Sequence, residues 1–240
     1  LSYSAPIFAA IKKNIPVIVH SRNAKAPNVF VSKILHQINW YLLPRGKVTM
    51  LAVSDKAGKW MFGNKAKYTV INNGIDISKY QFNGEARNKI RSELSLDNDE
   101  FCIIHVGAFR PQKNHFFLLD IFKEILRLNP KSKLLLVGTG ELLSAVEDKA
   151  KELNIFKNIL MLGKRDDIPA LLSASDAFLF PSLYEGFPNA VLEAQTSGLP
   201  CLISNSISNE VKINKNCQSL SLENSSENWA KKLLSLPKFE

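Results

Sequence analysis

The sequence predicts an α/β protein of two Rossmann-like, doubly wound domains, the first of them incomplete in this chain. Short β-branched runs alternate with helical patterns, as expected for right-handed βαβ units on parallel sheets. Hydrophobic residues make up 45% of the 240 residues, enough for the cores of one large or two modest domains. The alternation is interrupted once, by the turn-rich stretch "NNGIDISKY" (72–80), which we interpret as a linker. The predicted domains are therefore residues 1–76, including this linker's start, and residues 77–240.

The first series of elements is short. Its predicted strands are "IPVIVH" (15–20), "VTMLAVS" (48–54) and "KYTVIN" (67–72), and its predicted helices lie near 2–13, 30–43 and 55–62. Three strands resemble the back half of a doubly wound domain. The chain also begins at Leu1, inside a helical pattern, so we expect a fragment that is truncated at its N-terminus.

The second series holds about six strands and predicts a complete doubly wound domain. Its clearest strands are 101–107, 132–138, 158–163, 176–182 and 199–204, and its helices are 115–128, 141–153, 167–175 and 189–197. Ligands of such sheets bind beyond the carboxyl ends of the strands. Glycine, basic residues and carboxylates concentrate at those ends, which predicts a site there.

Charge is unevenly distributed. Residues 1–80 hold 12 Lys and Arg against 2 Asp and Glu, whereas residues 81–240 hold 19 against 20. A basic first third indicates phosphates, nucleic acid or an anionic membrane surface as partner, although solubility alone is an alternative. Nucleic acid is disfavoured, because no basic stripe interleaved with aromatic residues is present.

Cysteine usage and hydropathy indicate the cellular compartment. The three cysteines are too few and scattered for a disulfide framework, which favours a reducing, cytoplasmic environment: Cys102, Cys201 and Cys217. No apolar run reaches the roughly 18 residues of a membrane span, and no signal peptide is recognised.

The loop "GAFRPQKN" (107–114) places Arg110 and Lys113 between a predicted strand and a predicted helix. Two cations beside a helix N-terminus suit a diphosphate, because free N–H groups and the helix dipole add to their charge. A solvated loop with incidental charges is the alternative. "VGTGE" (137–141) lacks the third glycine of a dinucleotide fingerprint and reads better as a tight turn.

The stretch "LYEGFPNAVLEAQTSGLP" (183–200) places Glu185 in a loop and Glu193 about one turn inside the following helix. Pro188 suits the helix start, and Gly198 with Pro200 suits its end. The two carboxylates can hold hydroxyl groups, while the helix N-terminus between them can hold phosphate. A nucleotide sugar carries its groups in that order: sugar, diphosphate, ribose.

These motifs together resemble the retaining glycosyltransferases of family 4 (glycosyl transferases group 1), which have the two-domain GT-B fold. The similarity extends over about residues 15–210, through the Glu185–Glu193 pair, "VINNGID", "VGAFRPQKNHFFLLDIF", "LLLVGTGEL" and "LGKRDDIPALLSASDAFLFPSLYEGFPNAVLEAQTSGLPCLIS". It is most evident for bacterial enzymes of capsular and exopolysaccharide biosynthesis. Neither the family's N-terminal glycine-rich acceptor loop nor its C-terminal crossing segment is recognised, so truncation at the C-terminus is also an expectation.

The resemblance implies roles for individual residues. Glu185 would contact the donor sugar, Glu193 the ribose, and Lys113, helped by Arg110, the departing diphosphate. His20, after "VIV", would face the reacting sugar, although a capped strand-end histidine is the alternative. The remaining donor-site residues would be Gly107, Gly138, Gly163, Lys164, Arg165, Gly186, Phe187, Pro188 and Asn189. One departure is Ala108, which stands where many relatives carry a basic residue; whether Arg110 replaces it is left open.

The implied activity is transfer of a sugar, with retained configuration, from a nucleotide-diphosphate sugar to a saccharide acceptor that is lipid-linked or an oligosaccharide. UDP is the nucleotide that the resemblance implies, and "GKRDD" (163–167) suits uracil or guanine. No cofactor is expected. "DND" (97–99) is similar to the metal-binding D-x-D motif of the other glycosyltransferase fold, but it reads as a turn, so no metal is expected either. The basic residues 1–80 would contact the anionic inner membrane surface peripherally. Two alternatives are a nucleotide-sugar epimerase and a non-catalytic nucleotide-binding module.

Overall fold

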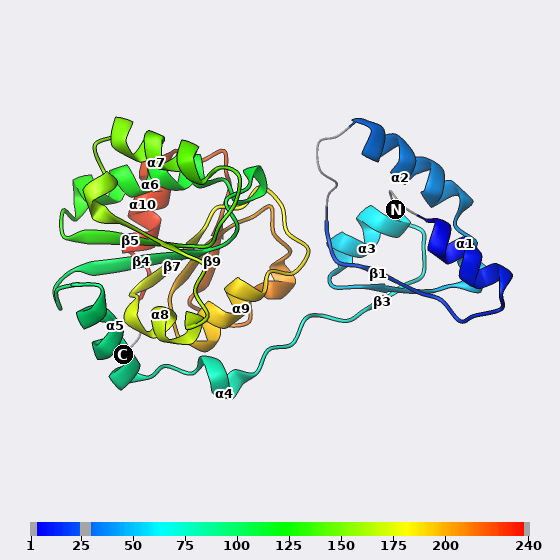
Figure 1. The fold of residues 1–240 in the computed structure, drawn as a ribbon, viewed down its shortest axis with the longest axis horizontal. Helices are drawn as coiled ribbons and strands as arrows, with labels where there is room; N and C mark the ends of the chain where they lie inside the picture. Colours follow the sequence, from blue (N-terminus) through cyan, green and yellow to red (C-terminus); the bar gives the residue numbers. More distant parts are fainter. Residues whose placement is uncertain (1–3, 25–29, 238–240) are drawn as a thin grey trace. The chain divides into compact units, whose positions relative to one another are not determined.

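The computed structural model describes residues 4–24 and 30–237, which form two compact units (Figure 1). The first unit comprises Leu1–Gly74 with Tyr184–Phe187, and the second comprises Ile75–Leu183 with Pro188–Glu240. Each unit contains one parallel β-sheet, which confirms the predicted α/β fold class. No helix within the described ranges has the length and apolar character to cross a membrane.

The first unit contains a three-stranded sheet in the order β1-β2-β3. The strands are β1 (Ile18–Ser21), β2 (Thr49–Ala52) and β3 (Thr69–Val70), and the helices are α1 (Ala5–Lys12), α2 (Phe30–Leu42) and α3 (Asp55–Phe62). All six elements match predicted ones, although residues 2 and 3 of the expected first helix lie outside the described part. Ser54 fixes the start of α3, because its hydroxyl accepts a hydrogen bond from the Ala57 N–H at 3.2 Å.

The second unit contains a six-stranded parallel sheet in the order β6-β5-β4-β7-β8-β9. Its strands are β4 (Phe101–Val106), β5 (Ser132–Val137), β6 (Ile159–Gly163), β7 (Ala177–Phe180), β8 (Cys201–Ser204) and β9 (Cys217–Leu220). The chain runs outward from β4 in one direction and returns to begin β7 on its other side. The carboxyl ends of β4 and β7 are therefore the topological switch point, where ligands of such sheets bind.

Helices cover both faces of this sheet (Figure 1). One layer holds α6 (His115–Leu128), α7 (Leu143–Glu152) and α10 (Ser226–Leu234); the other holds α5 (Gly84–Glu93), α8 (Ile168–Ala174) and α9 (Asn189–Thr196). The apolar stripe of α6 is fully buried against the sheet: Leu118, Leu119, Ile121, Phe122 and Ile125. Trp229 of α10 is also fully buried, and its indole N–H donates to the Ser221 carbonyl at 3.0 Å.

The structure corrects the sequence prediction in the linker and adds elements that the sequence did not suggest. Residues 77–80, expected within an irregular linker, form the helical turn α4 (Ile77–Tyr80). Asp76 caps this turn, since its carboxylate accepts from the Ser78 N–H at 3.1 Å and from the Ser78 hydroxyl at 2.6 Å. The helices α5 and α10 and the strand β9 were not predicted. The "DND" segment (97–99) lies between α5 and β4 and includes a turn, as expected.

Candidate active site

The loop after β4 is anchored at the switch point of the second unit. The Gly107 N–H donates to the Val137 carbonyl at 2.9 Å, which holds the loop beside β5. Asn114 adopts the left-handed conformation, with φ at 58°, and its side-chain amide donates to the Pro181 carbonyl at 3.1 Å. The Leu183 N–H donates to the Gln112 carbonyl at 2.8 Å. The ends of β4 and β7 are thus tied together around the predicted phosphate loop.

The two basic residues of this loop have different environments. Lys113 is half-buried, and its ammonium group lies 4.5 Å from the centroid of the Phe180 ring at the end of β7. Arg110 is exposed, where the short 3-10 helix Pro111–Lys113 begins. The structure therefore brings Lys113 to the switch point and leaves Arg110 at the surface.

Glycines allow the neighbouring strand ends to approach one another closely. Gly138 has φ at 143°, and a Cβ placed on it would lie 2.2 Å from the Gly107 carbonyl oxygen. A Cβ on Gly107 would lie 3.1 Å from His105 Nε2 and from two methylene carbons of Lys113. The Gly138 N–H donates to the Gly163 carbonyl at 2.8 Å. Three of the predicted glycines are thus brought to one edge of the sheet.

The loop after β6 holds the other predicted cations. Lys164 is exposed. The Arg165 guanidinium is bound by carboxylates: its Nε donates to Asp167 Oδ1 at 2.8 Å, and its Nη2 donates to Asp167 Oδ2 at 2.6 Å and to Glu93 Oε1 at 3.0 Å. Hydrogen bonds from Arg165 lower the pKa of Asp167, and the same bonds raise the pKa of Arg165. Arg165 thus fixes the loop onto α5, and a role in binding the base stays a prediction.

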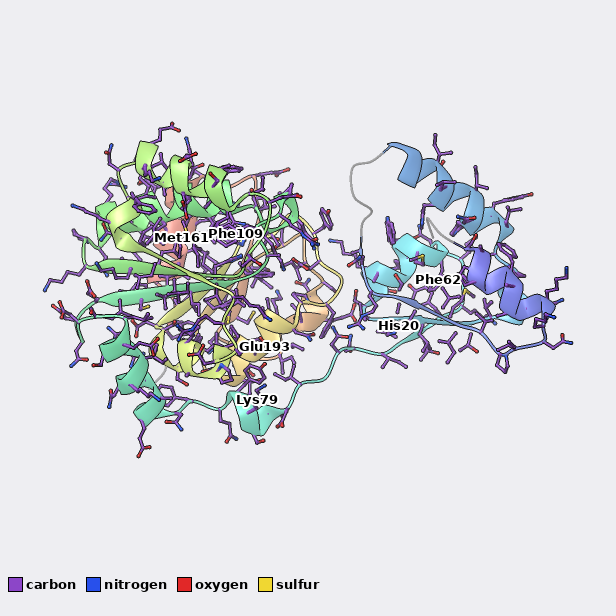
Figure 2. All side chains as sticks on the ribbon, in the orientation of Figure 1. His20, Phe62, Lys79, Phe109, Met161 and Glu193 are labelled. Atoms are coloured by element: carbon purple, nitrogen blue, oxygen red, sulfur yellow. The ribbon has the colours of Figure 1, made fainter. Side chains whose placement is uncertain are left out.

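Helix α9 begins at the predicted proline. Pro188 is its N-cap residue and makes no side-chain cap hydrogen bond, and Asn189 follows it in the first turn. Glu193 is half-buried one turn later, and burial raises the pKa of its carboxyl group, opposed by a hydrogen bond from Tyr80 and by the charge of Lys79. Figure 2 shows Glu193 on α9 beside α4, which carries Lys79.

The segment Tyr184–Phe187 belongs by its contacts to the first unit. The Ser54 hydroxyl donates to the Gly186 carbonyl at 2.8 Å, and the Asn73 side-chain amide donates to the Phe187 carbonyl at 2.9 Å. A Cβ on Gly186 would lie 2.0 Å from the Arg22 carbonyl oxygen, so only glycine fits there. Glu185 lies in this segment and is 8% exposed.

His20 is exposed on β1, which continues one residue beyond the expected strand end, to Ser21. The candidate site residues are consequently divided between the two units. His20, Glu185, Gly186 and Phe187 belong to the first unit, and the others to the second.

No group of three or more His, Cys, Asp or Glu side chains within residues 4–24 and 30–237 is arranged to hold a metal ion. A cavity of about 520 Å³ lies at the opposite edge of the second sheet, beside the amino ends of β4 and β8, and is lined partly by Arg87 and Asp176. The Asp176 carboxylate there accepts from Arg87 at 2.7 Å and from the Cys102 N–H at 2.7 Å. Those groups join α5 to the sheet and lie at the edge that ligands of doubly wound folds do not use.

Sequence reasoning did not predict that Tyr80 lies near Glu193 and influences its pKa. Tyr80 lies 113 positions before it in a stretch interpreted as linker, where only the Asp76–Ser78 pair could have signalled a helical turn. His105 and His115, which lie on either side of the phosphate loop, are buried, at 0% and 1% exposure.

Comparison with known proteins agrees with this architecture. Residues 86–238 match the sequence model of the family Glycosyl transferases group 1. The chain belongs to this family.

Two curated relatives illustrate the match. The chain is 33% identical over 210 residues to EpsF of Bacillus subtilis, covering 85% of this chain and 55% of EpsF. It is 40% identical over 153 residues to the UDP-Gal:alpha-D-GlcNAc-diphosphoundecaprenol alpha-1,3-galactosyltransferase of Escherichia coli, covering 61% of this chain and 39% of that enzyme. The chain therefore spans about half the length of these relatives or less.

Among solved structures, Anabaena HepE in complex with UDP-glucose matches with a TM-score of 0.84 and 22% identity, over 96% of this chain and 65% of HepE. WaaG, described as a glycosyltransferase of lipopolysaccharide biosynthesis, matches with a TM-score of 0.72 and 16% identity, over 97% of this chain and 71% of WaaG. At these identities the likeness shows the fold, which is that of GT-B glycosyltransferases over part of their length.

Proposed function

We propose that this chain carries the donor-binding part of a retaining glycosyltransferase. It would transfer a sugar from a UDP-sugar to a lipid-linked saccharide acceptor in the biosynthesis of a cell-surface polysaccharide, without a metal ion. One observation supports this most strongly. The chain belongs to this family, and the carboxyl edge of its second sheet carries the groups that a donor site needs. These groups are Lys113, the close-packed strand-end glycines, and the N-terminus of α9 with Glu193.

The proposed chemistry follows from the charge that develops during transfer. As the anomeric carbon becomes oxocarbenium-like, negative charge accumulates on the departing diphosphate, and fixed cations and helix N–H groups stabilise it. Lys113 and the first turn of α9 would supply that stabilisation, and Arg110 would contribute less because it is exposed. Glu193 would bind the ribose, and Glu185 the sugar hydroxyls. His20 would face the reacting sugar.

The wider assignment is part of the same proposal. Residues 77–240 would form the nucleotide-sugar domain, and residues 1–76 would belong to the acceptor-side domain. The basic residues of the first 80 positions would attract the anionic lipid surface from which a lipid-linked acceptor is presented. The name of the Escherichia coli relative includes such an acceptor, a diphosphoundecaprenol-linked sugar.

A binding panel tests the donor site. UDP, GDP, ADP and CMP would each be added at about 100 times an expected Kd, with and without EDTA, while thermal unfolding is followed. A ligand at that excess adds about 2.7 kcal/mol to stability. We expect stabilisation by UDP that survives EDTA and is lost in Glu193→Gln. Glu152→Gln is the matched control, because Glu152 is an exposed carboxylate of the same unit, on α7.

Activity would then be measured with a UDP-sugar and a polyprenyl-diphosphate-linked sugar, with the anomeric configuration of the product read by NMR. Transfer with retained configuration is the expected outcome. Conversion of the donor sugar without an acceptor would instead favour the epimerase. If no nucleotide stabilises a protein that unfolds cooperatively, the proposed donor site is refuted.

A further inference from the structure

Two cysteines of the second unit lie opposite each other on neighbouring strands. Cys201 is the first residue of β8 and Cys217 is the first residue of β9, and the parallel pairing of these strands places the two Cα atoms in register. Paired residues of adjacent strands point to the same face of a sheet. The two thiols therefore lie side by side at the amino edge of the sheet, although the residues are distant in the sequence.

The spacing of this pair suits a disulfide. Neighbouring strands lie about 4.7–4.9 Å apart, and bridged cysteines have Cα–Cα distances of about 4.4–6.8 Å. Both cysteines are free thiols in the structure, as is Cys102. Cys102 lies on β4, which is separated from β8 by β7. Two strand spacings amount to about 9.5 Å, beyond the roughly 7 Å that a bridge can span, so Cys102 cannot pair with Cys201.

Hydrogen bonds hold the starts of the two strands together. The Cys201 N–H donates to the Asn216 carbonyl at 3.0 Å. The Asn216 side-chain amide donates to the Gly198 and Leu199 carbonyls, at 3.0 and 3.2 Å. These bonds join the residue before Cys217 to the turn that leads into β8. A bridge can therefore form without unfolding of either strand, because the two cysteines already face the same side of the sheet.

The two thiols differ in exposure and in charge environment, which sets the order in which they react. Cys201 is fully buried, whereas Cys217 is 6% exposed on the edge strand of the sheet. The Lys212 ammonium donates to the hydroxyl of Ser219, which lies two residues beyond Cys217 on the same face of β9, at 3.2 Å. The pKa of Cys217 is lowered mainly by the Cys201 thiol and further by the charge of Lys212. Because the thiolate is the reactive form, Cys217 should react first.

We propose that Cys201 and Cys217 form a dithiol that peroxides oxidise to an intrachain disulfide, which joins the edge strand β9 covalently to β8. The Cys217 thiolate attacks one peroxide oxygen, the O–O bond breaks, and the other oxygen leaves as hydroxide, so that Cys217 becomes a sulfenic acid. The Cys201 sulfur then attacks the Cys217 sulfur. The S–S bond forms, the S–O bond breaks, and a second hydroxide leaves.

The reaction balances without any further reagent. The two sulfurs together lose two electrons, and the peroxide gains them. Each thiol proton ends on one of the hydroxides, so one peroxide yields two waters. The pair lies at the amino edge of the sheet, whereas the proposed donor site lies at the carboxyl edge, so this inference does not rest on the proposed function.

The test treats the folded, reduced chain with hydrogen peroxide and then counts its thiols in denaturant. The count should fall from three per chain to one, and dithiothreitol should restore all three. Trypsin can cleave after Lys212 and Lys215, which lie between the two cysteines. The bridge should therefore join two tryptic peptides that mass spectrometry finds separated only after reduction.

Variants identify the two partners and the order of the steps. Cys102→Ser is the matched control, because it removes the third thiol and should still form the bridge. Cys217→Ser should keep both of its remaining thiols. In Cys201→Ala the sulfenic acid has no second thiol to react with, so dimedone should label Cys217. Phenylarsine oxide, which binds two adjacent thiols, gives a measurement on the unmutated chain and should protect both cysteines from peroxide.

Several results would overturn the inference. They are three thiols that persist in the peroxide-treated chain, a bridge that includes Cys102 or joins two chains, and sulfinic acid at Cys217 with the Cys201 thiol retained. A bridge that forms only in urea would also overturn it, because the folded strands would then not be its cause. None of these outcomes depends on nucleotide binding, so they are distinguishable from a failure of the proposed function.

Discussion

Replacing Gly138 by alanine tests whether the strand-end glycines build the candidate site. The new Cβ would lie 2.2 Å from the Gly107 carbonyl oxygen and 2.9 Å from its carbon, both backbone atoms that cannot move aside alone. Overpacking of this kind costs about 1–3 kcal/mol. The φ of 143° is sparsely populated by residues with a side chain, which adds about 1–3 kcal/mol. We therefore expect Gly138→Ala to destabilise the second unit by about 4 kcal/mol and to weaken UDP binding.

The matched control is Gly163→Ala, at the last residue of the neighbouring strand β6. Gly163 also has a positive φ, 62°, but a Cβ there meets nothing within 4 Å, so only backbone strain of about 1 kcal/mol is expected. Urea denaturation would be followed by Trp229 fluorescence in a Trp40→Phe, Trp60→Phe background. At a slope of about 2 kcal/mol per M, Gly138→Ala should lower the midpoint by about 2 M. A loss no greater than that of Gly163→Ala would refute the close-packing argument.

Three other measurements test the electrostatics of the second unit. Asp176→Ala leaves the Arg91 side chain, which is 3% exposed, without its carboxylate partner. The free energy of unfolding, measured by urea denaturation, should fall by about 3 kcal/mol, and a loss of less than about 1 kcal/mol would contradict this. Burial lowers the pKa of His115 from 6.5 to about 4. Between these values the unfolded chain binds a proton at His115 and the folded chain does not, so the free energy of unfolding should fall by about 3 kcal/mol as the pH drops from 7 to 4. His115→Phe should remove that share of the pH dependence, and an unchanged slope would count against it. Iodoacetamide should label Cys217 before Cys102. The pKa of Cys217 is lowered mainly by the hydrogen bond with the Cys201 thiol, whereas burial raises the pKa of Cys102 to about 12. The reverse order of labelling, followed by mass spectrometry, would be evidence against these environments.

Elements with a strong local pattern could be predicted from the sequence, and those held by distant partners could not. The apolar stripe of α6 and the β-branched runs of β4 and β5 carry their own periodicity. The helix α5 has few buried residues, Ile90 and Arg91, and the latter is held by Asp176, 85 positions away. Its amphipathic signal is therefore weak, although Asn83 caps it by accepting from the Ala86 N–H at 2.9 Å. Strand β9 likewise has one buried residue and pairs at a sheet edge.

The candidate site shows the same division. The rule that ligands bind at the carboxyl ends of parallel strands located Lys113 and Glu193 at one edge, because it depends only on strand order. The contacts that hold the turn at Gly186 come from Ser54 and Asn73, more than 110 positions earlier. No local pattern encodes such pairs, and Tyr80 was missed for this reason.

The two buried histidines beside the phosphate loop influence the charge of the site without needing to touch a ligand. His105 shares a hydrogen bond of 2.9 Å between its Nδ1 and the Leu179 carbonyl, which assigns the proton to Nδ1 and leaves Nε2 as a lone pair beside Gly107. Neither nitrogen of His115 has a hydrogen-bond partner among the residues that the structure describes. Desolvation lowers the pKa of both imidazoles, and the charge of Lys113 lowers them further. Both rings consequently stay neutral near pH 7, so they fill the space under the loop without adding cations beside Lys113. Lys113 therefore brings its positive charge to the end of β7 without a second cation from either imidazole.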